Sequence, residues 1–361
     1  MHLLHVVSTG EWGGAERYAF DICRYFKARG WDVGVLTRDT AAVDRAFVRE
    51  EIRIHHAPLR RRIDPASVRA LAKCFKAMER GKGVVHVHTG HDALNCIIAR
   101  RIARRPDIRL VATRHTAGRV RDGLLRRITC RGIDSFLFVS EFSRNEYCRC
   151  WEGRTSAPLD KSKTAITYNS LFRKREESLE EPERGPVSAA YRGGLKPGKG
   201  LETLIDALAL LKDCRIRLRL MGKGNPDYVD TLRQRALRAG VADRIDWTRH
   251  TDFAEEALKK VHFGVLPSEE PEAFGMANME FMACGKAQIS TFTGAQGELL
   301  RAGTDALEVA PGDSEALAAA IRSLATDPEL RSRMGREAFQ RYTTAFAWPH
   351  FIKRLIPHYI R

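Results

Sequence analysis

The sequence has no apolar run close to the ~20 residues that a membrane-spanning helix needs. Its start, MHLLHVVSTGEWGG, lacks the basic region and long apolar core of a signal peptide, so we expect a first β-strand there. The eight cysteines form no Cys-x-x-Cys pair and fall within apparent helices and strands. This favours free thiols in a reducing, cytoplasmic setting over zinc sites or disulfides.

Motifs for metals and nucleic acids are also missing. There is no Asp-x-Asp pair suited to Mg²⁺, and no helix-turn-helix, RRM or zinc-finger pattern. We therefore expect no metal cofactor and no nucleic-acid partner, although the net charge is +16. Residues 1–180 carry 35 Lys and Arg against 21 Asp and Glu, which leaves only +2 for the remainder. A basic first half attracts anions such as lipid headgroups or phosphorylated substrates.

Strand-like and helix-like segments alternate along all 361 residues, a length typical of two domains. Such alternation predicts an α/β protein with two Rossmann-like, doubly wound domains facing a cleft. A charged segment without an apolar face divides the chain. We expect a first domain at 1–170, a linker at 171–186 and a second domain at 187–345. Ligands in such sheets bind beyond the carboxyl ends of the strands.

One stretch, PEAFGMANMEFMACG at 271–285, places two acids around an apparent helix start. Glu272 follows a predicted buried strand, and Glu280 lies about a turn and a half into the helix. The unpaired N–H groups near Phe274, Gly275 and Met276 form a site for an anion, and the glycine lets a ligand approach the backbone. The two acids would then grip hydroxyls on either side of a diphosphate. Alternatively, they are solvated acids beside a helix start and on an exposed face.

A longer segment, PSEEPEAFGMANMEFMACGKAQISTFTGAQGELL, resembles the P-S-x-x-E-x-F-G-x-x-x-x-E-A-M-A-x-G-x-P-V…G-G-x-x-E pattern of retaining glycosyltransferases of family four, which have the GT-B fold. Other pieces resemble the family in the same order along residues 1–345. They are EWGGAER, VATRHTAG, FVSEFSR, ITYNSL, YRGGLKPGKGLETLIDAL and MGKG.

The resemblance implies roles for single residues. Glu272 would bind hydroxyls of the donor sugar, Lys199 would neutralise the leaving phosphate, and Glu280 would bind the ribose. His115 would lie near the transferred sugar, and the final helix, 346–361, would pack back onto the first domain. The backbone positions around the diphosphate would be Phe274, Gly275 and Met276 from the second domain, with Gly13 and Gly14 from the first.

The chain departs from the family at the phosphate-binding arginine, which is Gly194 here. Arg192 lies two residues earlier on the same strand face, roughly 6–7 Å away. Either Arg192 compensates or the cation is lost. Milder departures are Gly198 in place of Glu, Phe281 in place of Ala and Ala287 in place of Pro.

The acceptor side is less defined. His86 and His88 share a strand face that a metal ion could use, but VVHVHTGHD also matches the strand that ends near the acceptor cleft of the family. We therefore assign His88 and His91 to the lining of the cleft. Asp92 is either an acceptor base or, as we favour, the cap of the next helix.

A basic amphipathic helix is predicted within GRVRDGLLRRITCRG, residues 118–132. It indicates docking on anionic lipid, although a solvated face over a core stripe gives the same pattern. The residues expected to dock are Arg119, Arg121, Leu124, Arg126 and Arg127.

Together these features predict a metal-independent, retaining glycosyltransferase, peripheral on the inner face of a membrane. It would move a sugar from a nucleotide-sugar, for which we favour UDP and leave GDP open, to a lipid-linked or lipopolysaccharide-type acceptor. Contacts near Arg249–Asp252 would select the base. Two alternatives stay open: a catalytically weak nucleotide-sugar-binding paralogue, which the missing cation at Gly194 favours, and a sugar-phosphate synthase of the same fold.

Overall fold

The chain forms two compact units in a computed structural model, which describes residues 1–9, 12–152, 159–173, 182, 186–248, 254–258 and 260–360. Unit 1 comprises Met1–Asn169 with Phe351–Arg361, and unit 2 comprises Ser170–His350. Most of the expected linker and the segment Arg249–Asp252 lie outside the described residues.

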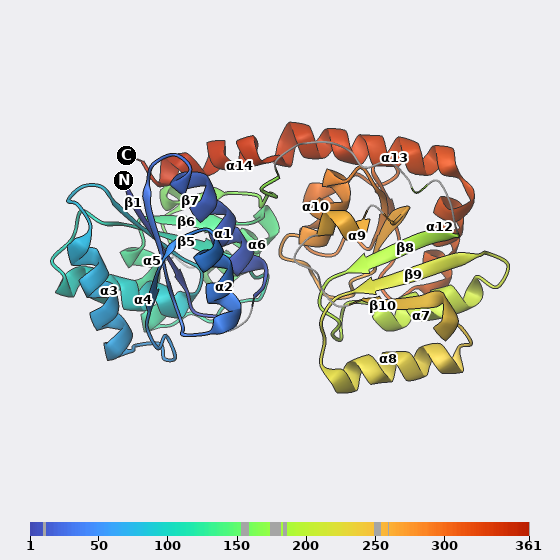
Figure 1. Ribbon diagram of the computed structural model, residues 1–361, viewed down its shortest axis with the longest axis horizontal. Helices are drawn as coiled ribbons and strands as arrows, with labels where there is room; N and C mark the ends of the chain where they lie inside the picture. The colour runs from blue at the N-terminus through green and yellow to red at the C-terminus, as the bar shows by residue number, and fades with distance from the viewer. Residues whose placement is uncertain are drawn as a thin grey trace. The chain divides into compact units, whose positions relative to one another are not determined.

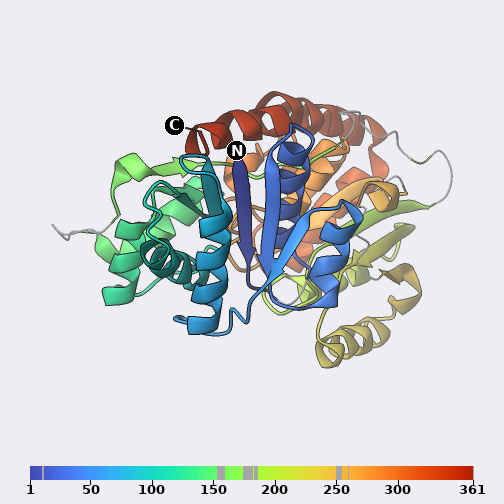
Figure 2. The same ribbon diagram turned by 60° about the vertical axis from the view of Figure 1, so that its left-hand side comes forward.

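Unit 1 is built on a seven-stranded parallel sheet with the strand order β3-β2-β1-β4-β5-β6-β7. Helices cover both faces, with α1 and α2 on one side and α3, α4 and α5 on the other (Figures 1 and 2). The strands are β1 (His2–Val7), β2 (Asp32–Thr37), β3 (Arg53–His56), β4 (Gly83–Val87), β5 (Arg109–Arg114), β6 (Ser135–Phe138) and β7 (Thr164–Ile166). The helices are α1 (Gly14–Lys27), α2 (Ala41–Arg49), α3 (Pro65–Ala77), α4 (Gly90–Ile102), α5 (Leu124–Gly132) and α6 (Glu141–Cys148).

Unit 2 repeats this plan with a six-stranded parallel sheet in the order β10-β9-β8-β11-β12-β13. Its strands are β8 (Val187–Arg192), β9 (Ile216–Met221), β10 (Ile245–Thr248), β11 (Phe263–Leu266), β12 (Ala287–Ser290) and β13 (Ala306–Glu308). Its helices are α7 (Leu201–Leu210), α8 (Pro226–Arg238), α9 (Ala254–Leu258), α10 (Met276–Ala283), α11 (Gln296–Leu299), α12 (Ser314–Thr326) and α13 (Pro328–Arg341), and α14 (Trp348–Leu355) runs from unit 2 into unit 1.

The apolar periodicity of the sequence explains these elements. In α1, Tyr18, Ile22 and Phe26 recur every four residues and are all buried against the sheet. The central strands are buried on both faces, as in parallel sheets covered by helices, and they read as continuous apolar runs. The predicted fold class, two doubly wound α/β sheets, is confirmed.

Strand order reverses once in each sheet, between β1 and β4 and between β8 and β11. At such a point the loops that leave the two neighbouring strands run in opposite directions and leave room for a ligand. The segments after β1 and β4 and those after β8 and β11 contain most of the predicted site residues, so the topology brings them to these two edges.

The predicted helix over 118–132 is wrong at its start, because α5 begins only at Leu124. Gly123 stands immediately before the helix, and Val120 is buried in the loop that precedes it. Leu124 is 75% exposed and Ile128 is 39% exposed. The apolar residues of this segment therefore do not form a single core stripe.

Candidate functional site

Backbone hydrogen bonds join two loops at the point of unit 2 where the strand order reverses. The carbonyl oxygen of Gly198, in the loop after β8, accepts the backbone N–H groups of Glu269 and Glu270, each at 3.0 Å, from the loop after β11. Gly200 has φ +67°, and a Cβ there would lie 1.8 Å from the carbonyl oxygen of Pro267. Only glycine allows this approach, so the loops hold a fixed relative position.

Each predicted carboxylate of unit 2 is paired with a cation from the neighbouring segment. The Lys199 ammonium lies 2.5 Å from Glu272 Oε1, which also accepts the hydroxyl of Ser268 at 2.8 Å. Arg192, the last residue of β8, donates from Nε to the Glu280 carboxylate in α10. The structure thus brings four predicted residues into two acid–base pairs at the carboxyl ends of β8 and β11.

The first turn of α10 fits the predicted anion site. Gly275 caps the helix with φ +96°, and its cap has no side-chain hydrogen bond. A Cβ at this position would lie 2.6 Å from Asn278 Oδ1, so glycine is needed for both the backbone angle and the space. The N–H groups that open the helix beside Met276 therefore have no side-chain acceptor at the cap, and buried Phe274 anchors the preceding turn.

A buried amide network that we did not predict supports this helix. Asn278 Nδ2 donates to Gln288 Oε1 at 3.0 Å, and Gln296 Nε2 donates to Asn278 Oδ1 at 3.1 Å. Gln296 Oε1 in turn accepts the hydroxyl of Thr293 at 3.2 Å. The sequence signal was present as polar residues inside apolar segments, MANMEFMA and AQIS, but only the fold shows that they meet.

The departures from the family pattern have local explanations. Gly198 adopts φ +80°, which favours glycine over the family's Glu. Phe281, in place of Ala, covers Gly264 of β11, where a Cβ would lie 2.5 Å from its ring. At Gly194 the structure has room for a side chain, because a Cβ there would meet only Lys196, at 3.9 Å.

The predicted glycines of unit 1 lie where α1 begins. Gly13 is the cap of α1, and a Cβ there would lie 3.1 Å from Glu16 Oε2. A Cβ at Gly14 would meet nothing within 4 Å. Neither residue has a left-handed backbone angle, and a side chain at position 14 would meet no neighbour. The described part of unit 1 therefore does not require glycine at position 14. The Glu16 carboxylate is buried and accepts the hydroxyl of Thr9.

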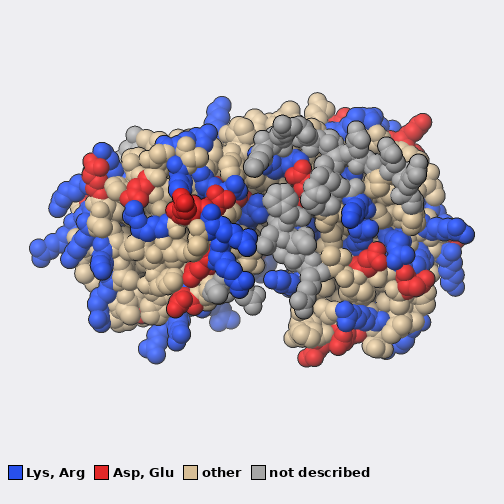
Figure 3. All heavy atoms as spheres, viewed as in Figure 1, with Lys and Arg blue, Asp and Glu red and all other residues tan. Residues whose placement is uncertain are grey.

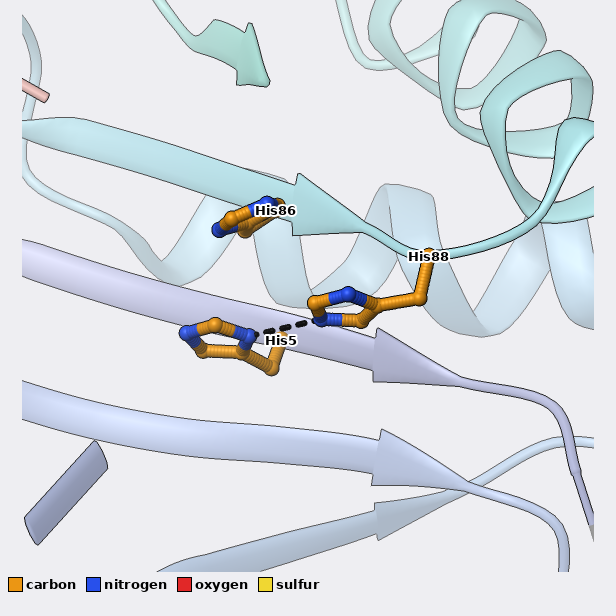
Figure 4. Close-up of side chains that lie close together, drawn as sticks. All are labelled: His5, His86 and His88. Atoms are coloured by element: carbon orange, nitrogen blue, oxygen red, sulfur yellow. Dashed lines mark hydrogen bonds between the residues drawn. The ribbon is translucent and has the colours of Figure 1, made fainter. Parts of the chain in front are cut away.

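Histidines gather at the reversal point of unit 1 (Figure 4). His5 of β1 pairs in register with His86 of β4, and strand alternation brings His88 to the same face. His5 Nδ1 lies 2.9 Å from His88 Nε2, and His88 Nδ1 lies 3.0 Å from His115 Nε2. His5 was not predicted, because a lone histidine in LLHVVS carries no motif.

A metal ion is the other use of such a cluster. His5, His86 and His88 offer ring nitrogens that lie within 4.8 Å of one another. However, both nitrogens of His86 have hydroxyl partners, Tyr359 at 2.5 Å and Thr113 at 2.7 Å. The facing nitrogens of His5 and His88 are bonded to each other. Apart from His5 Nε2, which has no partner among the described residues, the cluster is held together as a hydrogen-bonded network, and we assign no metal to it.

Two further predicted residues lie at the start of α4. The expectation that Asp92 caps this helix is wrong, because Thr89 is the N-cap and its side chain accepts the backbone N–H of Asp92. Asp92 Oδ2 accepts the Thr89 hydroxyl at 2.8 Å, and burial raises the pKa of Asp92 to about 6. His91 is exposed, and its pKa is lowered by partial burial and by the guanidinium groups of Arg62, Arg126 and Arg38.

Three of the residues expected to dock on lipid also have partners within unit 1. Arg119 pairs with Glu146 at 3.2 Å, and Arg127 pairs with Asp122 at 2.6 Å. Arg126 donates to the hydroxyl of Tyr147 at 3.2 Å. Arg121 and Leu124 are exposed.

Sequence comparisons identify both units. Residues 12–156 match the family described as Glycosyltransferase Family 4, and residues 173–341 match Glycosyl transferases group 1. Glycogen synthase of Mycobacterium tuberculosis is 32% identical over 169 residues, which span 46% of this chain and 41% of that protein. The lipopolysaccharide core biosynthesis glycosyltransferase LpsE of Rhizobium meliloti is 30% identical over 169 residues, or 47% of this chain and 48% of that protein. The chain thus matches less than half the length of these two relatives.

Solved structures show the same fold. HepE of Anabaena, in complex with UDP and glucose, superposes with a TM-score of 0.80 over 98% of both chains at 19% identity. A glycosyltransferase of Rickettsia africae superposes with a TM-score of 0.83 over 99% of this chain and 97% of that one, at 17% identity.

The histidine network makes unit 1 sensitive to acid. Burial, with a smaller effect of nearby charge, lowers the pKa of His5 from 6.5 to about 3 and that of His115 to about 4. The folded state therefore keeps both rings neutral, whereas the unfolded chain binds protons below pH 6.5. Stability is complete above pH 6.5 and is lost as pH falls toward the folded pKa values, by roughly 2 kcal/mol for each ring at pH 5.

Denaturant unfolding at pH 7.5 and pH 5.0 measures this loss. His5→Asn removes one of the titrating rings and is expected to lose roughly 2 kcal/mol less than the wild type over this interval. Acid-sensitive groups outside the histidine network contribute equally to both proteins, so equal losses would contradict the account.

Proposed function

The chain belongs to the family 4, group 1 glycosyltransferases of GT-B fold, and from this premise we propose that it moves a sugar from a UDP-sugar to a lipid-linked or lipopolysaccharide-type acceptor. The observation that carries the proposal is the arrangement at the reversal point of unit 2. There the pairs Lys199–Glu272 and Arg192–Glu280 flank the glycine-capped start of α10.

The donor would bind with its diphosphate at the first turn of α10. The two carboxylates are acceptors suited to hydroxyls, with Glu272 toward the sugar and Glu280 toward the ribose. Their cations hold them in place before the ligand arrives, which lowers the cost of ordering them on binding. The UDP and glucose bound by HepE, which shares the fold, support this choice of donor.

The same groups suit the chemistry of transfer. Negative charge builds on the diphosphate as the glycosidic bond breaks, and Lys199 with the α10 amides would stabilise that charge. A metal ion is then not needed, so we propose metal-independent transfer, testable as activity unchanged by EDTA. We also propose that the anomeric configuration is retained, as the family resemblance implies, and proton NMR of the product tests it.

Donor binding is the first measurement. UDP is expected to bind the wild type, and Glu280→Ala is expected to weaken it about tenfold or more, because hydrogen bonds to a carboxylate contribute more than neutral ones. Isothermal titration calorimetry with UDP and GDP measures both effects. Glu315→Ala, an exposed acid in the first turn of α12, is the matched control.

Melting temperatures of the variants separate lost binding from lost stability, since Glu280→Ala leaves Arg192 without this carboxylate. Binding of neither nucleotide by the wild type would refute the transferase assignment. Tight binding without turnover would favour the alternative, a nucleotide-sugar-binding paralogue with weak catalysis.

Position 194 offers a gain-of-function experiment. Because the structure has space for a side chain there, Gly194→Arg is expected to restore the family's cation and to tighten UDP binding about tenfold, the effect of one charge-assisted phosphate contact. Gly194→Gln, which adds a shorter polar side chain without the charge, is the control. Equal affinities of the two variants would show that this position does not face the diphosphate.

The role of Arg192 is tested beside it. If Arg192 both holds Glu280 and replaces the missing cation, Arg192→Ala abolishes turnover and Gly194→Arg in that background restores part of it. A fully active Arg192→Ala enzyme would rule the replacement out.

For the acceptor, we propose a cytoplasmic protein that docks on the anionic inner face of a membrane through α5 and the preceding loop. No helix among the described residues is long and apolar enough to cross a bilayer. Exposed Leu124 and Ile128 lie among arginines, a combination that favours an anionic interface. Figure 3 shows Lys and Arg side chains over this view of unit 1, with Asp and Glu among them. The lipopolysaccharide relative LpsE supports such an acceptor.

Vesicle sedimentation tests the docking. The wild type is expected to bind phosphatidylglycerol vesicles and not phosphatidylcholine vesicles, and Leu124→Glu is expected to weaken binding about tenfold. Leu237→Glu, at a leucine that is 59% exposed in α8, is the control. Equal binding by the two variants would exclude this surface.

A phosphorylated sugar acceptor is the second candidate, favoured by the three arginines around His91. It predicts that a hexose phosphate binds to the wild type and that Arg62→Ala weakens this binding, whether or not vesicles bind. Absence of hexose-phosphate binding would remove this candidate.

A further inference from the structure

The histidines of unit 1 form a chain of imidazoles that runs from the sheet interior to the edge of the predicted site. Its two links are His5 Nδ1 to His88 Nε2 at 2.9 Å and His88 Nδ1 to His115 Nε2 at 3.0 Å. The rings of His5 and His88 are nearly parallel, at 7°, with centroids 5.2 Å apart. With facing nitrogens only 2.9 Å apart, these rings meet edge to edge.

Such a chain has only two self-consistent proton arrangements. A neutral imidazole has one N–H and one bare nitrogen, and each link uses one of each. Either all three rings carry the proton on Nδ1, and donation runs from His5 through His88 to His115, or all three carry it on Nε2 and donation runs the other way. The tautomer of His115 is therefore fixed by His5, two links away.

The buried end of the chain selects between the two arrangements. His5 Nε2 is buried and has no hydrogen-bond partner among the described residues. In the second arrangement this nitrogen would carry an orphaned N–H, whereas in the first it is a bare acceptor. In folded proteins, buried N–H groups without an acceptor are rarer than buried acceptors without a donor. The first arrangement is thus the stable one.

The surroundings hold the last ring in place. The ring of Tyr18 meets His115 edge to face at 4.9 Å between centroids and also contacts His88. Unlike His5, His115 is only half-buried, and its Nδ1 has no partner among the residues that the structure describes. This nitrogen is the open end of the chain.

We propose that His5 and His88 are positioning residues that fix His115 as the Nδ1–H tautomer, so that its free nitrogen is a hydrogen-bond donor to an oxygen of the bound sugar. This use of His115 rests on the proposed glycosyl transfer, whereas the tautomer itself does not. The donor would be directed at a hydroxyl or ring oxygen, and the fixed tautomer would disfavour a ligand that presents a donor at that point.

Two substitutions at His5 distinguish the effect of its hydrogen-bond donor from the effect of its ring volume. In His5→Asn the amide nitrogen takes the place of Nδ1–H, so donation to His88 is kept. In His5→Phe the ring volume is kept and the donor is lost. His5→Asn is expected to keep the wild-type tautomers, and His5→Phe to shift His88 and His115 toward Nε2–H. The kcat/KM for transfer is expected to fall about tenfold in His5→Phe and to stay near the wild-type value in His5→Asn.

The tautomers are read directly from proton–nitrogen correlation spectra of ¹⁵N-histidine-labelled, ligand-free protein at pH 7.5. Wild-type signals of His88 and His115 with the proton on Nδ1 support the proposal. An Nε2–H signal for His115, or unchanged tautomers in His5→Phe, would overturn it. The wild-type spectrum decides even if His5→Phe does not fold.

The spectra also separate this inference from the proposed function. Nδ1–H signals in a protein that binds neither UDP nor a UDP-sugar would sustain the tautomer and reject the transfer. Normal nucleotide binding and turnover with an Nε2–H signal at His115 would support the proposed transfer and reject the inferred tautomer.

Discussion

The carbonyl oxygen of Gly198 accepts two backbone N–H groups, and the candidate site of unit 2 depends on this contact. It fixes the segment after β8 against the segment after β11, with Gly200 seated on Pro267. Lys199 and Glu272 lie on these two segments, so their ion pair follows from the backbone arrangement. A site whose groups are held before the ligand arrives needs little reorganisation, which is the basis of electrostatic preorganisation.

Charge in this site is balanced without a ligand. Lys199 and Arg192 each face a carboxylate, and both pairs are largely shielded from water, with side chains between 6% and 22% exposed. Neither cation is therefore left unpaired in a partly buried setting, which would be costly. An incoming diphosphate would accept hydrogen bonds from the α10 amides. It would also accept them from those N–H groups of Lys199 and Arg192 that do not face a carboxylate. Because each cation would contact both the diphosphate and a carboxylate, binding of the diphosphate would affect the position of the acids that bind the hydroxyls.

The sequence predicted the structure correctly where a periodic apolar pattern, or a motif with a clear chemical role, lay within one local segment. Alternating strands and helices predicted the two sheets, and the spacing of Glu272 and Glu280 around a glycine predicted the acids at the start of α10. Partners that are distant in the sequence could not be predicted. Strand alternation placed Arg192 on one face of β8, but only the fold shows that it contacts Glu280, 88 residues away.

The other misses have the same origin. His5 has no local motif, and its role depends on the register of β1 against β4. The start of α5 was wrong because the predicted helix included Gly118 and Gly123, and glycine is a weak helix former. At α4, Thr89 and Asp92 both suit a helix start, and the choice between them is made by backbone angles that sequence does not specify.

The contact between Phe281 and Gly264 limits which substitutions either position can accept. The large ring on α10 occupies the space above a residue of β11 that has no side chain, so neither position is free to change alone. Returning Phe281 to the alanine of the family pattern would open a cavity, and enlarging Gly264 would create a clash. The two positions are therefore coupled, so that a change at either one is expected to be tolerated only with a compensating change at the other.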